Sequence, residues 1–566
     1  MTTKRPVTPS AIPETVCEGL IIQIGVPDMS PREALLLAQR VVAETLRGRW
    51  DIKPLGLYVR EFMAVKPPGT RRISVARAWE LAAQLRQHRD VAAAEPALVL
   101  PGLTPEPMQM FTEDEQQALP AEIAAASLSC TEPHDWALTL CSVPTAWQLP
   151  LPGNGHGKRY GEGIVVGHPD TGYTRHPEIW DPARLLVGQG YDFESADSNA
   201  EDPLVGPTPG HGTSTASVIM SSVISGVDGI YVTGAAPATS LAPLRVATSV
   251  VHLSFANLTQ ALYFAADQGH HVISMSLGGP VGSSALQRAI RYALDRGVIL
   301  LAAAGNYWPW VVYPAKYDEV IAVAACNCQR GVWAYSSKGP AVDVTAPGEE
   351  VWVASSERDG TFINRRGSGT SFAVAITAGI CALWLAHHGR DYLIERYGAA
   401  HLAAVFKELV ITAGVDTPPG WDSTRYGAGI VNAHKVLAAA LPDTSPAGGV
   451  YALHASAVPA DDQTALLDYL PDADPTQLHL ALLRLLNTNA RQAGPLLDQY
   501  GDELQFQMAT NPTVRDIIGR LASSEPVDVP MLRRQLVTDP QFIDQASKGL
   551  QALLQRDLDA VDAGRG

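Results

Sequence analysis

Ser371 lies in a stretch of sequence that suits a nucleophile. The small residues Gly369 and Thr370 lead into it, and an apolar run through Leu385 follows. A tight turn that feeds a buried helix would place Ser371 at the helix N-terminus, where unpaired backbone N–H groups and the positive end of the helix dipole gather. A serine in this position can attack a carbonyl carbon and have the resulting oxyanion stabilised. The same pattern also fits a simple helix N-cap, so other residues must distinguish the two interpretations.

Three further polar residues lie beside short apolar strands or helix starts. Asp170 follows an apolar strand that begins at Ile164, and Asn306 closes an apolar run that begins at Val298. His211 lies between glycines, which let the backbone approach closely before a helix starts. A histidine can take the proton of a serine, and a buried carboxylate on its other ring nitrogen fixes the tautomer and stabilises the imidazolium. The pattern therefore predicts nucleophilic catalysis by a serine.

Each of these residues belongs to a short motif, and the motifs follow one another in the order Asp, His, Asn, Ser. The motifs are Asp170-Thr171-Gly172, His211-Gly212-Thr213, Ser276-Leu277-Gly278-Gly279, Ala304-Gly305-Asn306 and Gly369-Thr370-Ser371. In these motifs and in their order, roughly over 134–441, the chain resembles the subtilisin-like (subtilase) serine proteases.

The resemblance implies a serine endopeptidase that cleaves protein or peptide substrates through an acyl-enzyme. We expect no cofactor and no metal site. Asp170, His211 and Ser371 would form the triad, and the Asn306 amide would hold the oxyanion together with the Ser371 N–H group. The residues implied in substrate binding are Ser276, Leu277, Gly278, Ala304 and Gly305. Calcium is common in the family, but 225–229 shows no cluster of oxygen ligands. The alternative is a catalytically silent peptide-binding protein with the same fold.

Three segments depart from the family pattern: His168-Pro169, 307–310, and Ala375-Ile376, where the helix after Ser371 should tolerate the change. His168-Pro169 stands directly before Asp170, where an apolar strand usually continues, and the missing N–H of proline predicts that the strand ends early. The segment 307–310, with two tryptophans, is bulkier and shorter than the glycine-rich loop that normally follows the oxyanion asparagine. If Trp308 or Trp310 lines the first specificity pocket, small or medium apolar residues should be preferred at the cleaved position.

The elements that position these residues alternate between strands and helices throughout the catalytic region. This alternation predicts a parallel sheet with helices on both faces. Catalytic groups are then expected at the carboxyl ends of the strands. The predicted fold is therefore α/β, a three-layer αβα subtilisin-like core with a mostly parallel sheet, joined to a small α+β N-terminal domain and an all-α C-terminal domain.

The chain is long enough for two or three cores, and changes of composition divide it. The predicted parts are a flexible tail at 1–16, a propeptide-like α+β domain at 17–101, a linker at 102–133, the catalytic domain at 134–441 and a helical domain at 442–566.

The N-terminal domain reads as strand, helix, strand, helix, strand, with extended segments at 57–59 and 62–65 and capping signals at Ser30 and Ser74. A small α+β domain ahead of a subtilase core resembles the propeptides of that family, which act as intramolecular chaperones and inhibitors. Self-cleavage is then expected between Pro101 and Asp135. The alternative is a permanent accessory domain.

The C-terminal region has three predicted helices that begin with a capping residue and a proline, at Asp474-Pro475, Asn511-Pro512 and Asp539-Pro540. The simplest interpretation is a helical domain that packs on itself. A second is that it docks an unknown protein.

Composition excludes several classes of partner. A net charge of −16 argues against nucleic acid and anionic membranes. No apolar signal segment follows the N-terminus, and the six cysteines show no framework spacing, so a reducing, cytoplasmic location is expected. Metal binding by Cys326 and Cys328 is a weaker interpretation than two ordinary strand-end positions.

Overall fold

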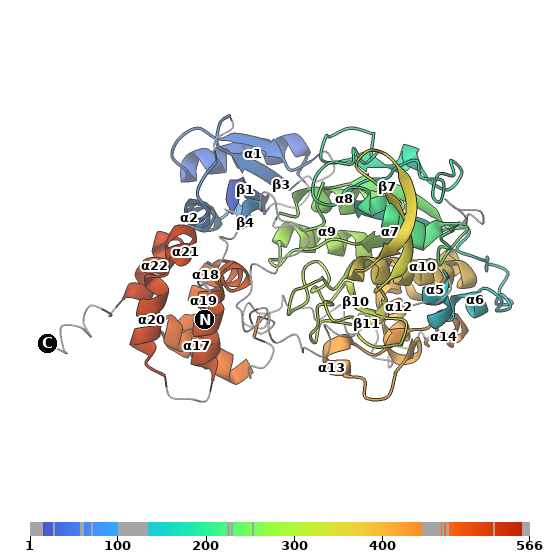
Figure 1. The fold of residues 1–566 in the computed structure, drawn as a ribbon. Coiled ribbons are helices and arrows are strands. Elements are labelled where there is room, and N and C mark those ends of the chain that lie inside the picture. Colours follow the sequence, from blue (N-terminus) through green and yellow to red (C-terminus); the bar gives the residue numbers. More distant parts are fainter. Residues whose placement is uncertain are drawn as a thin grey trace, which may run out of the picture.

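The computed structural model describes three packed units (Figure 1). The described residues are 15–25, 29–56, 61–69, 72–99, 134–222, 227, 230–251, 254–443, 466, 469–470, 475–523, 527–556 and 558. We call the units the N-terminal unit (15–99), the catalytic unit (134–443) and the helical unit (466–558).

The catalytic unit is built on a nine-stranded sheet in the order β14-β15-β11-β10-β9-β8-β5-β7-β6, parallel except for β14. Its strands are β5 (Val165–Asp170), β6 (Tyr191–Asp192), β7 (Ser240–Arg245), β8 (Val272–Met275), β9 (Ile299–Ala303), β10 (Ile321–Cys326), β11 (Val344–Pro347), β14 (Val415–Asp416) and β15 (Ile430–Val431). A separate antiparallel pair is formed by β12 (Val351–Ser356) and β13 (Phe362–Gly367).

Helices cover both faces of this sheet, as the alternation of strands and helices predicted. The side chain of His168 on β5 faces Thr215 of α7, whereas a Cβ on the neighbouring Gly167 would meet His270 and Ala265 at the end of α8. Since successive residues of a strand point to opposite faces, α7 and α8 lie on opposite sides. The helices are α5 (Trp136–Leu140), α6 (Val143–Ala146), α7 (His211–Met220), α8 (Ala256–Asp267), α9 (Ser284–Leu294), α10 (Thr370–His388), α11 (Arg390–Tyr397), α12 (Leu402–Ala413), α13 (Ser423–Tyr426) and α14 (Ala433–Ala438).

Pro169 does not end β5 early, contrary to the prediction. The strand runs through Asp170 and pairs with β7 over its whole length. Its pairing with β8 ends at Gly167, so from His168 onward the strand is paired on one side only. A proline is tolerated there because a strand paired on one side lacks half of its ladder partners.

Helix α10 crosses the centre of the catalytic unit and is buried along its whole length. It is long and apolar enough to cross a membrane, but its burial inside the unit identifies it as a core helix.

The N-terminal unit is a four-stranded antiparallel sheet, order β2-β3-β1-β4, with two helices. Its elements are β1 (Val16–Ile24), α1 (Pro31–Thr45), β2 (Asp51–Pro54), β3 (Phe62–Lys66), α2 (Val75–Arg86) and β4 (Val91–Val99). The capping box predicted at Ser30 and the cap predicted at Ser74 are both present. The strand β2 was not predicted, and the extended segment predicted at 57–59 lies outside the described residues.

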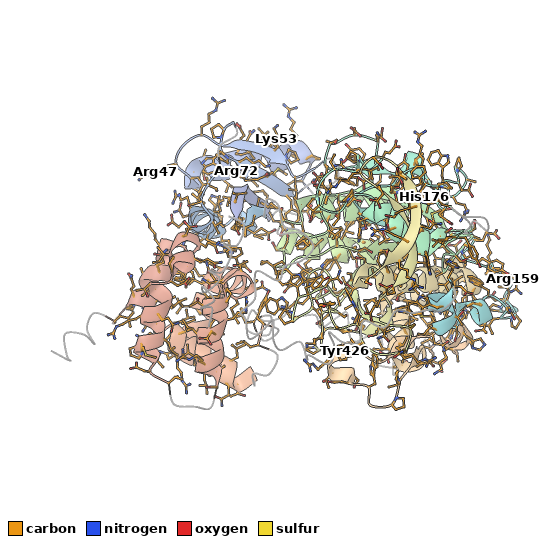
Figure 2. All side chains as sticks on the ribbon, in the orientation of Figure 1. Arg47, Lys53, Arg72, Arg159, His176 and Tyr426 are labelled. Atoms are coloured by element: carbon orange, nitrogen blue, oxygen red, sulfur yellow. The ribbon has the colours of Figure 1, made fainter. Side chains whose placement is uncertain are left out.

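The sheet of the N-terminal unit is covered on both faces. Leu20, Ile22 and Ile24 of β1 point to the unit's own helices, whereas Ile21 joins the core of the catalytic unit. Exposed Arg47, Lys53 and Arg72 mark the outer surface of the N-terminal unit (Figure 2).

The helical unit contains six helices in its described part. They are α17 (Pro475–Leu485), α18 (Ala490–Thr510), α19 (Pro512–Ala522), α20 (Val529–Val537), α21 (Pro540–Gln545) and α22 (Lys548–Gln555). Asn511 and Asp539 cap α19 and α21 through their side chains, as predicted, whereas Asp474 lies outside the described residues. The predicted linker at 102–133 and much of 442–465 also lie outside them.

The cysteines give a mixed result. Cys17, Cys141, Cys326 and Cys381 are free and buried. Cys328 is disulfide-bonded, so the structure does not support a compartment in which all cysteines are reduced. The cytoplasmic location stays a prediction.

Candidate active site

Ser371 lies in the first turn of α10, where the sequence placed it. Gly369 is the N-cap residue and Thr370 begins the helix. The side chain of Ser371 is largely buried, with 5% of the residue exposed. Backbone N–H groups of a first turn have no partner within the helix, so this end of α10 can stabilise negative charge.

His211 and Asp170 form a short buried contact. His211 opens α7, and its Nδ1 lies 2.8 Å from Oδ1 of Asp170, the last residue of β5. The same oxygen accepts a hydrogen bond from the Thr171 N–H group at 2.7 Å. Burial alone would raise the pKa of Asp170, but the charge and hydrogen bond of His211 and the Thr171 bond bring it below its ordinary value. Asp170 is therefore ionised and favours the Nδ1–H form of His211.

Two glycines allow this contact. A Cβ on Gly212 would overlap the carbonyl oxygen of Gly172 and come within 3.2 Å of the Asp170 Cβ atom. Gly172 itself has a φ of +109°, which side chains rarely permit. The start of α7 can therefore lie directly against the turn that follows β5.

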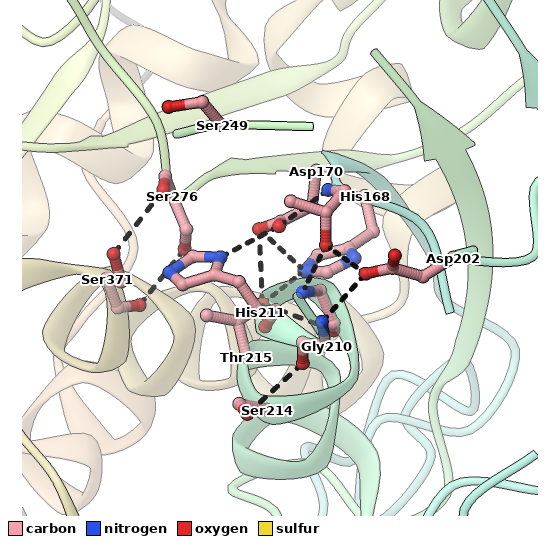
Figure 3. A network of polar contacts seen from close by, with 12 residues as sticks. His168, Asp170, Asp202, Gly210, His211, Ser214, Thr215, Ser249, Ser276 and Ser371 are labelled. Carbon is pink, nitrogen blue, oxygen red and sulfur yellow. Dashed lines mark hydrogen bonds and ion pairs between the residues drawn. The ribbon is translucent and has the colours of Figure 1, made fainter. Parts of the chain in front are cut away.

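The imidazole of His211 lies between Asp170 and Ser371 (Figure 3). One ring nitrogen points to Asp170 and the other lies on the side of Ser371. The Ser371 hydroxyl donates to the carbonyl oxygen of Ser276 at 3.4 Å in this structure. This long bond is weak, so it does not hold the Ser371 hydroxyl firmly in this direction.

Asn306 is oriented by Thr370. Its Oδ1 accepts hydrogen bonds from the Thr370 N–H group at 2.9 Å and from the Thr370 hydroxyl at 2.8 Å. With the oxygen held there, the amide nitrogen is the end of the side chain that remains for an oxyanion. The neighbouring Gly305 has a φ of +114°, and a Cβ on it would lie 2.8 Å from Ser337 Oγ. Only glycine fits this turn without displacing its neighbours.

The predicted substrate-binding residues lie at the ends of neighbouring strands. Ser276, Leu277 and Gly278 follow β8, while Ala304 and Gly305 follow β9, which pairs with it. The Gly278 N–H group donates to the Val250 carbonyl oxygen at 2.9 Å. In this structure the Gly278 N–H group is therefore occupied by the chain itself.

Trp308 and Trp310 are buried, with 5% and 2% exposed. They belong to an apolar cluster that continues into the helical unit. Trp310 packs edge-on against Tyr469, with ring centroids 4.9 Å apart, and the Arg515 guanidinium lies 5.1 Å from the Trp310 ring centroid. Both rings therefore contribute to an interface between units, a role that the sequence did not predict.

Two residues behind Asp170 were not recognised as part of the site. Thr215 lies one helical turn beyond His211, and His168 precedes Asp170 by two residues, so both share the face that carries the site. The periodicities of strand and helix were the signal that could have identified them.

No cluster of three or more His, Cys, Asp or Glu side chains arranged for a metal occurs in the described parts of the chain.

Three comparisons relate the chain to known proteins. The family model that matches, over residues 161–429, is described as the subtilase family. Thermitase of Thermoactinomyces vulgaris is 35% identical over 297 residues, which cover 52% of this chain and 92% of the relative. Subtilisin DY of Bacillus licheniformis is 33% identical over 278 residues, which cover 48% of this chain and 90% of the relative. A solved protease structure from Pseudoalteromonas arctica is 25% identical with a TM-score of 0.43, covering 53% of this chain and 93% of that one.

The matched residues span the whole of the site and leave the N-terminal and helical units outside. Protein or peptide substrates follow from this relationship. The chain belongs to the subtilase family and is a subtilisin-like serine endopeptidase.

Proposed function

We propose that the protein hydrolyses peptide bonds with Ser371 as nucleophile, His211 as general base and Asp170 as the group that orients His211. The observation that carries this proposal is the 2.8 Å contact between His211 Nδ1 and Asp170 Oδ1, next to a serine in the first turn of α10. The Asn306 amide and the Ser371 N–H group would hold the oxyanion.

In the proposed steps His211 takes up one proton and passes it on. His211 Nε2 takes the proton of the Ser371 hydroxyl while Oγ bonds to the carbonyl carbon of the substrate. Collapse of the oxyanion breaks the C–N bond, and the leaving amine takes the proton from His211. Water then repeats the sequence on the acyl-enzyme, with His211 first accepting and then returning the proton.

A fluorophosphonate probe with mass spectrometry of the intact chain tests the nucleophile. We expect wild type to gain one adduct and Ser371→Ala to gain none, with turnover lower by about 10⁴–10⁶-fold. Asn306→Leu should lower turnover by about 10²–10³-fold, the loss known for the corresponding change in subtilisin. Labelling of the Ser371→Ala variant would refute the assignment, and an inactive wild type would favour a silent peptide-binding protein.

We further propose that the chain is made as a self-inhibited precursor. Support comes from the sheet of the N-terminal unit, which packs on the catalytic unit, and from Glu95 of β4, which reaches the start of α9. The Glu95 carboxylate accepts hydrogen bonds from the Ser283 hydroxyl at 2.6 Å and from the Ser284 N–H group at 2.9 Å. From there the chain would continue by strand addition into the cleft.

The predicted cut lies between Pro101 and Asp135, where 101–133 fall outside the described ranges, and N-terminal sequencing tests it. Wild type should acquire a new N-terminus within 102–134, whereas Ser371→Ala should stay full length. An intact N-terminus in fully active enzyme would instead identify a permanent accessory domain.

The role of the helical unit is open between two proposals. Two of its described contacts join it to the catalytic unit of the same chain. Tyr469 donates to the Pro280 carbonyl oxygen at 2.6 Å, and Gln505 donates to the Tyr313 hydroxyl at 2.8 Å. These contacts favour a structural role beside the substrate-binding segments. Docking of an unknown protein stays a prediction.

A further inference from the structure

A second histidine lies behind the carboxylate that contacts His211. His168 precedes Asp170 by two residues on β5, so the two side chains point to the same face of the sheet. His168 is 1% exposed, and its Nε2 lies 3.9 Å from Oδ2 of Asp170, which is the oxygen that does not contact His211 (Figure 3). This distance is too long for a hydrogen bond.

Thr215 connects the two groups. It lies four residues after His211 on α7, directly one turn along the helix. Its Oγ1 lies 2.9 Å from His168 Nε2 and donates to Asp170 Oδ2 at 3.3 Å. The helix offers the same hydroxyl two other acceptors, the carbonyl oxygens of His211 at 3.2 Å and of Gly212 at 3.3 Å.

The single hydroxyl proton of Thr215 cannot serve all of these acceptors. If His168 Nε2 carried no proton, it would be the nearest acceptor, and Asp170 Oδ2 would lose its donor. The nearby carboxylate favours a proton on Nε2, because positive hydrogen is stabilised by negative charge at this distance. Burial lowers the pKa of His168 to about 4, against the opposing effect of Asp170, so the ring is neutral near pH 7 and carries one proton.

We propose that His168 is a positioning residue: its Nε2–H group donates to Thr215 and so directs the Thr215 hydroxyl to Asp170 Oδ2. The carboxylate of Asp170 then has donors on both oxygens, His211 and Thr171 on Oδ1 and Thr215 on Oδ2. Two-sided donation fixes the plane of the carboxylate and hence the ring of His211. It also spreads the negative charge, which weakens the attraction of Asp170 for a proton on His211.

Other charged groups near Asp170 have separate partners. Asp202, whose pKa burial raises, accepts from the Thr171 hydroxyl at 2.7 Å and from the Gly210 N–H group at 2.9 Å. Arg245 lies beside Asp170 in the register of β7 and is paired with Asp192 at 2.6 Å. Variants at His168 or Thr215 leave these contacts in place.

The test measures kcat and KM against pH on a peptide substrate, using the active wild-type preparation and the same preparation of each variant. Thr215→Val removes the hydroxyl at nearly constant shape. We expect kcat to fall about 5–20-fold with KM within about twofold, since one hydrogen bond to a charged group is lost. The acidic limb of the pH profile should move to higher pH, because Asp170 then attracts the His211 proton more strongly.

Variants of His168 distinguish the loss of its Nε2–H donor from the loss of side-chain volume. His168→Gln keeps an N–H donor at similar reach and should stay within about threefold of wild type. His168→Asn is too short to reach Thr215 and should resemble Thr215→Val in rate and in pH profile. The double variant His168→Asn/Thr215→Val should be no slower than Thr215→Val alone within about twofold, because both changes remove one pathway. Thr377→Val, which removes a buried hydroxyl that bonds the Ala373 carbonyl oxygen in α10, is the matched control and should match wild type.

We call the donation from His168 to Thr215 and from Thr215 to Asp170 Oδ2 the relay. Several outcomes would overturn it. One is that His168→Asn lowers kcat by the same factor in the wild-type and Thr215→Val backgrounds. Another is that the acidic limb of the pH profile does not move in Thr215→Val or His168→Asn. A third is that His168→Gln is as slow as His168→Asn. The proton resonance of the His211 Nδ1–H group gives a second readout without turnover, and it should shift in Thr215→Val and His168→Asn but not in His168→Gln.

The inference rests on the proposed function, and the two can fail separately. If Ser371→Ala keeps its activity, the triad assignment fails. If Ser371→Ala is inactive while the Thr215 and His168 variants match wild type, only the relay fails.

Discussion

The N-terminal unit contacts both the catalytic unit and the helical unit, through two different junctions. Its sheet packs on the catalytic unit through apolar side chains, among them Ile21, Leu55 and Phe62, with Glu95 at the start of α9 among the polar contacts. Its helix α2 meets the helical unit through a buried apolar cluster that both units share, which includes Trp79 and Phe506 with ring centroids 6.0 Å apart. We call these the sheet junction and the helix junction.

Both junctions are apolar, and they differ in their polar contacts. Glu95 accepts three hydrogen bonds from Ser283 and Ser284 at the N-terminus of α9. At the helix junction Arg86 pairs with Asp502 at 2.9 Å, but the Asp502 side chain is 53% exposed. The sheet junction should therefore determine the orientation of the N-terminal unit, and the helix junction should add little specificity.

The largest expected effect comes from opening the sheet junction. Phe62→Ala removes a side chain that is 1% exposed and should destabilise the N-terminal unit and its docking by about 3–5 kcal/mol. Hydrogen exchange along β1 and β3 measures the loss, and probe labelling of Ser371 should accelerate. Leu36→Ala, at a residue 56% exposed on α1, is the control and should change neither. Unchanged exchange in Phe62→Ala would mean that the sheet is not held by apolar packing.

The next effect is a pH dependence at the helical unit. Glu503 is 2% exposed and accepts hydrogen bonds from Ser547, and burial raises its pKa to about 7 despite these bonds. A raised carboxyl pKa means that the folded state binds more protons, so stability should fall as pH rises from about 4.5 to about 7, by about 3 kcal/mol in total. Urea unfolding followed on this unit at several pH values measures the slope. Glu503→Gln should flatten it, and a slope that survives the substitution would point to another group.

Glu95 should have an intermediate effect on docking. Glu95→Ala removes the acceptor of three hydrogen bonds and should weaken docking by about 1–3 kcal/mol, seen as faster probe labelling of Ser371. Burial raises the pKa of Glu95 despite the serine donors, so docking should weaken as pH rises through that raised pKa. Glu95→Gln should lose the pH dependence but retain part of the contact. Equal labelling rates for wild type and Glu95→Ala would place the determinant of docking elsewhere in the sheet junction.

The smallest effect is expected at the ion pair of the helix junction. Arg86→Ala and Asp502→Ala should each change stability by about 0.2–1 kcal/mol, and less at high salt, because the pair is solvent-screened. A double-mutant cycle on the full chain measures the coupling. Coupling well above this range would overturn the ranking of the two junctions.

Local signals in the sequence predicted much of the catalytic unit. The run before Asn306, the turn before Ser371 and the glycines around His211 each set one element and one side chain within a few residues. Such signals act over one turn or one strand, so they are readable without knowledge of the fold. The parallel sheet followed from the alternation of elements, and the capping residues Ser30 and Asn511 followed from their position before proline.

The sequence by itself therefore determined which side chains are the candidates for the catalytic chemistry and at which ends of the elements they lie. Only the tertiary structure decided that Trp308 and Trp310 are buried in a cluster shared with the helical unit. It also decided that Thr215 contacts both His168 and Asp170. These contacts join residues far apart in the chain, and their partners carry no local pattern. Their energies depend on burial and on which groups face one another, so they exist only once the elements have packed.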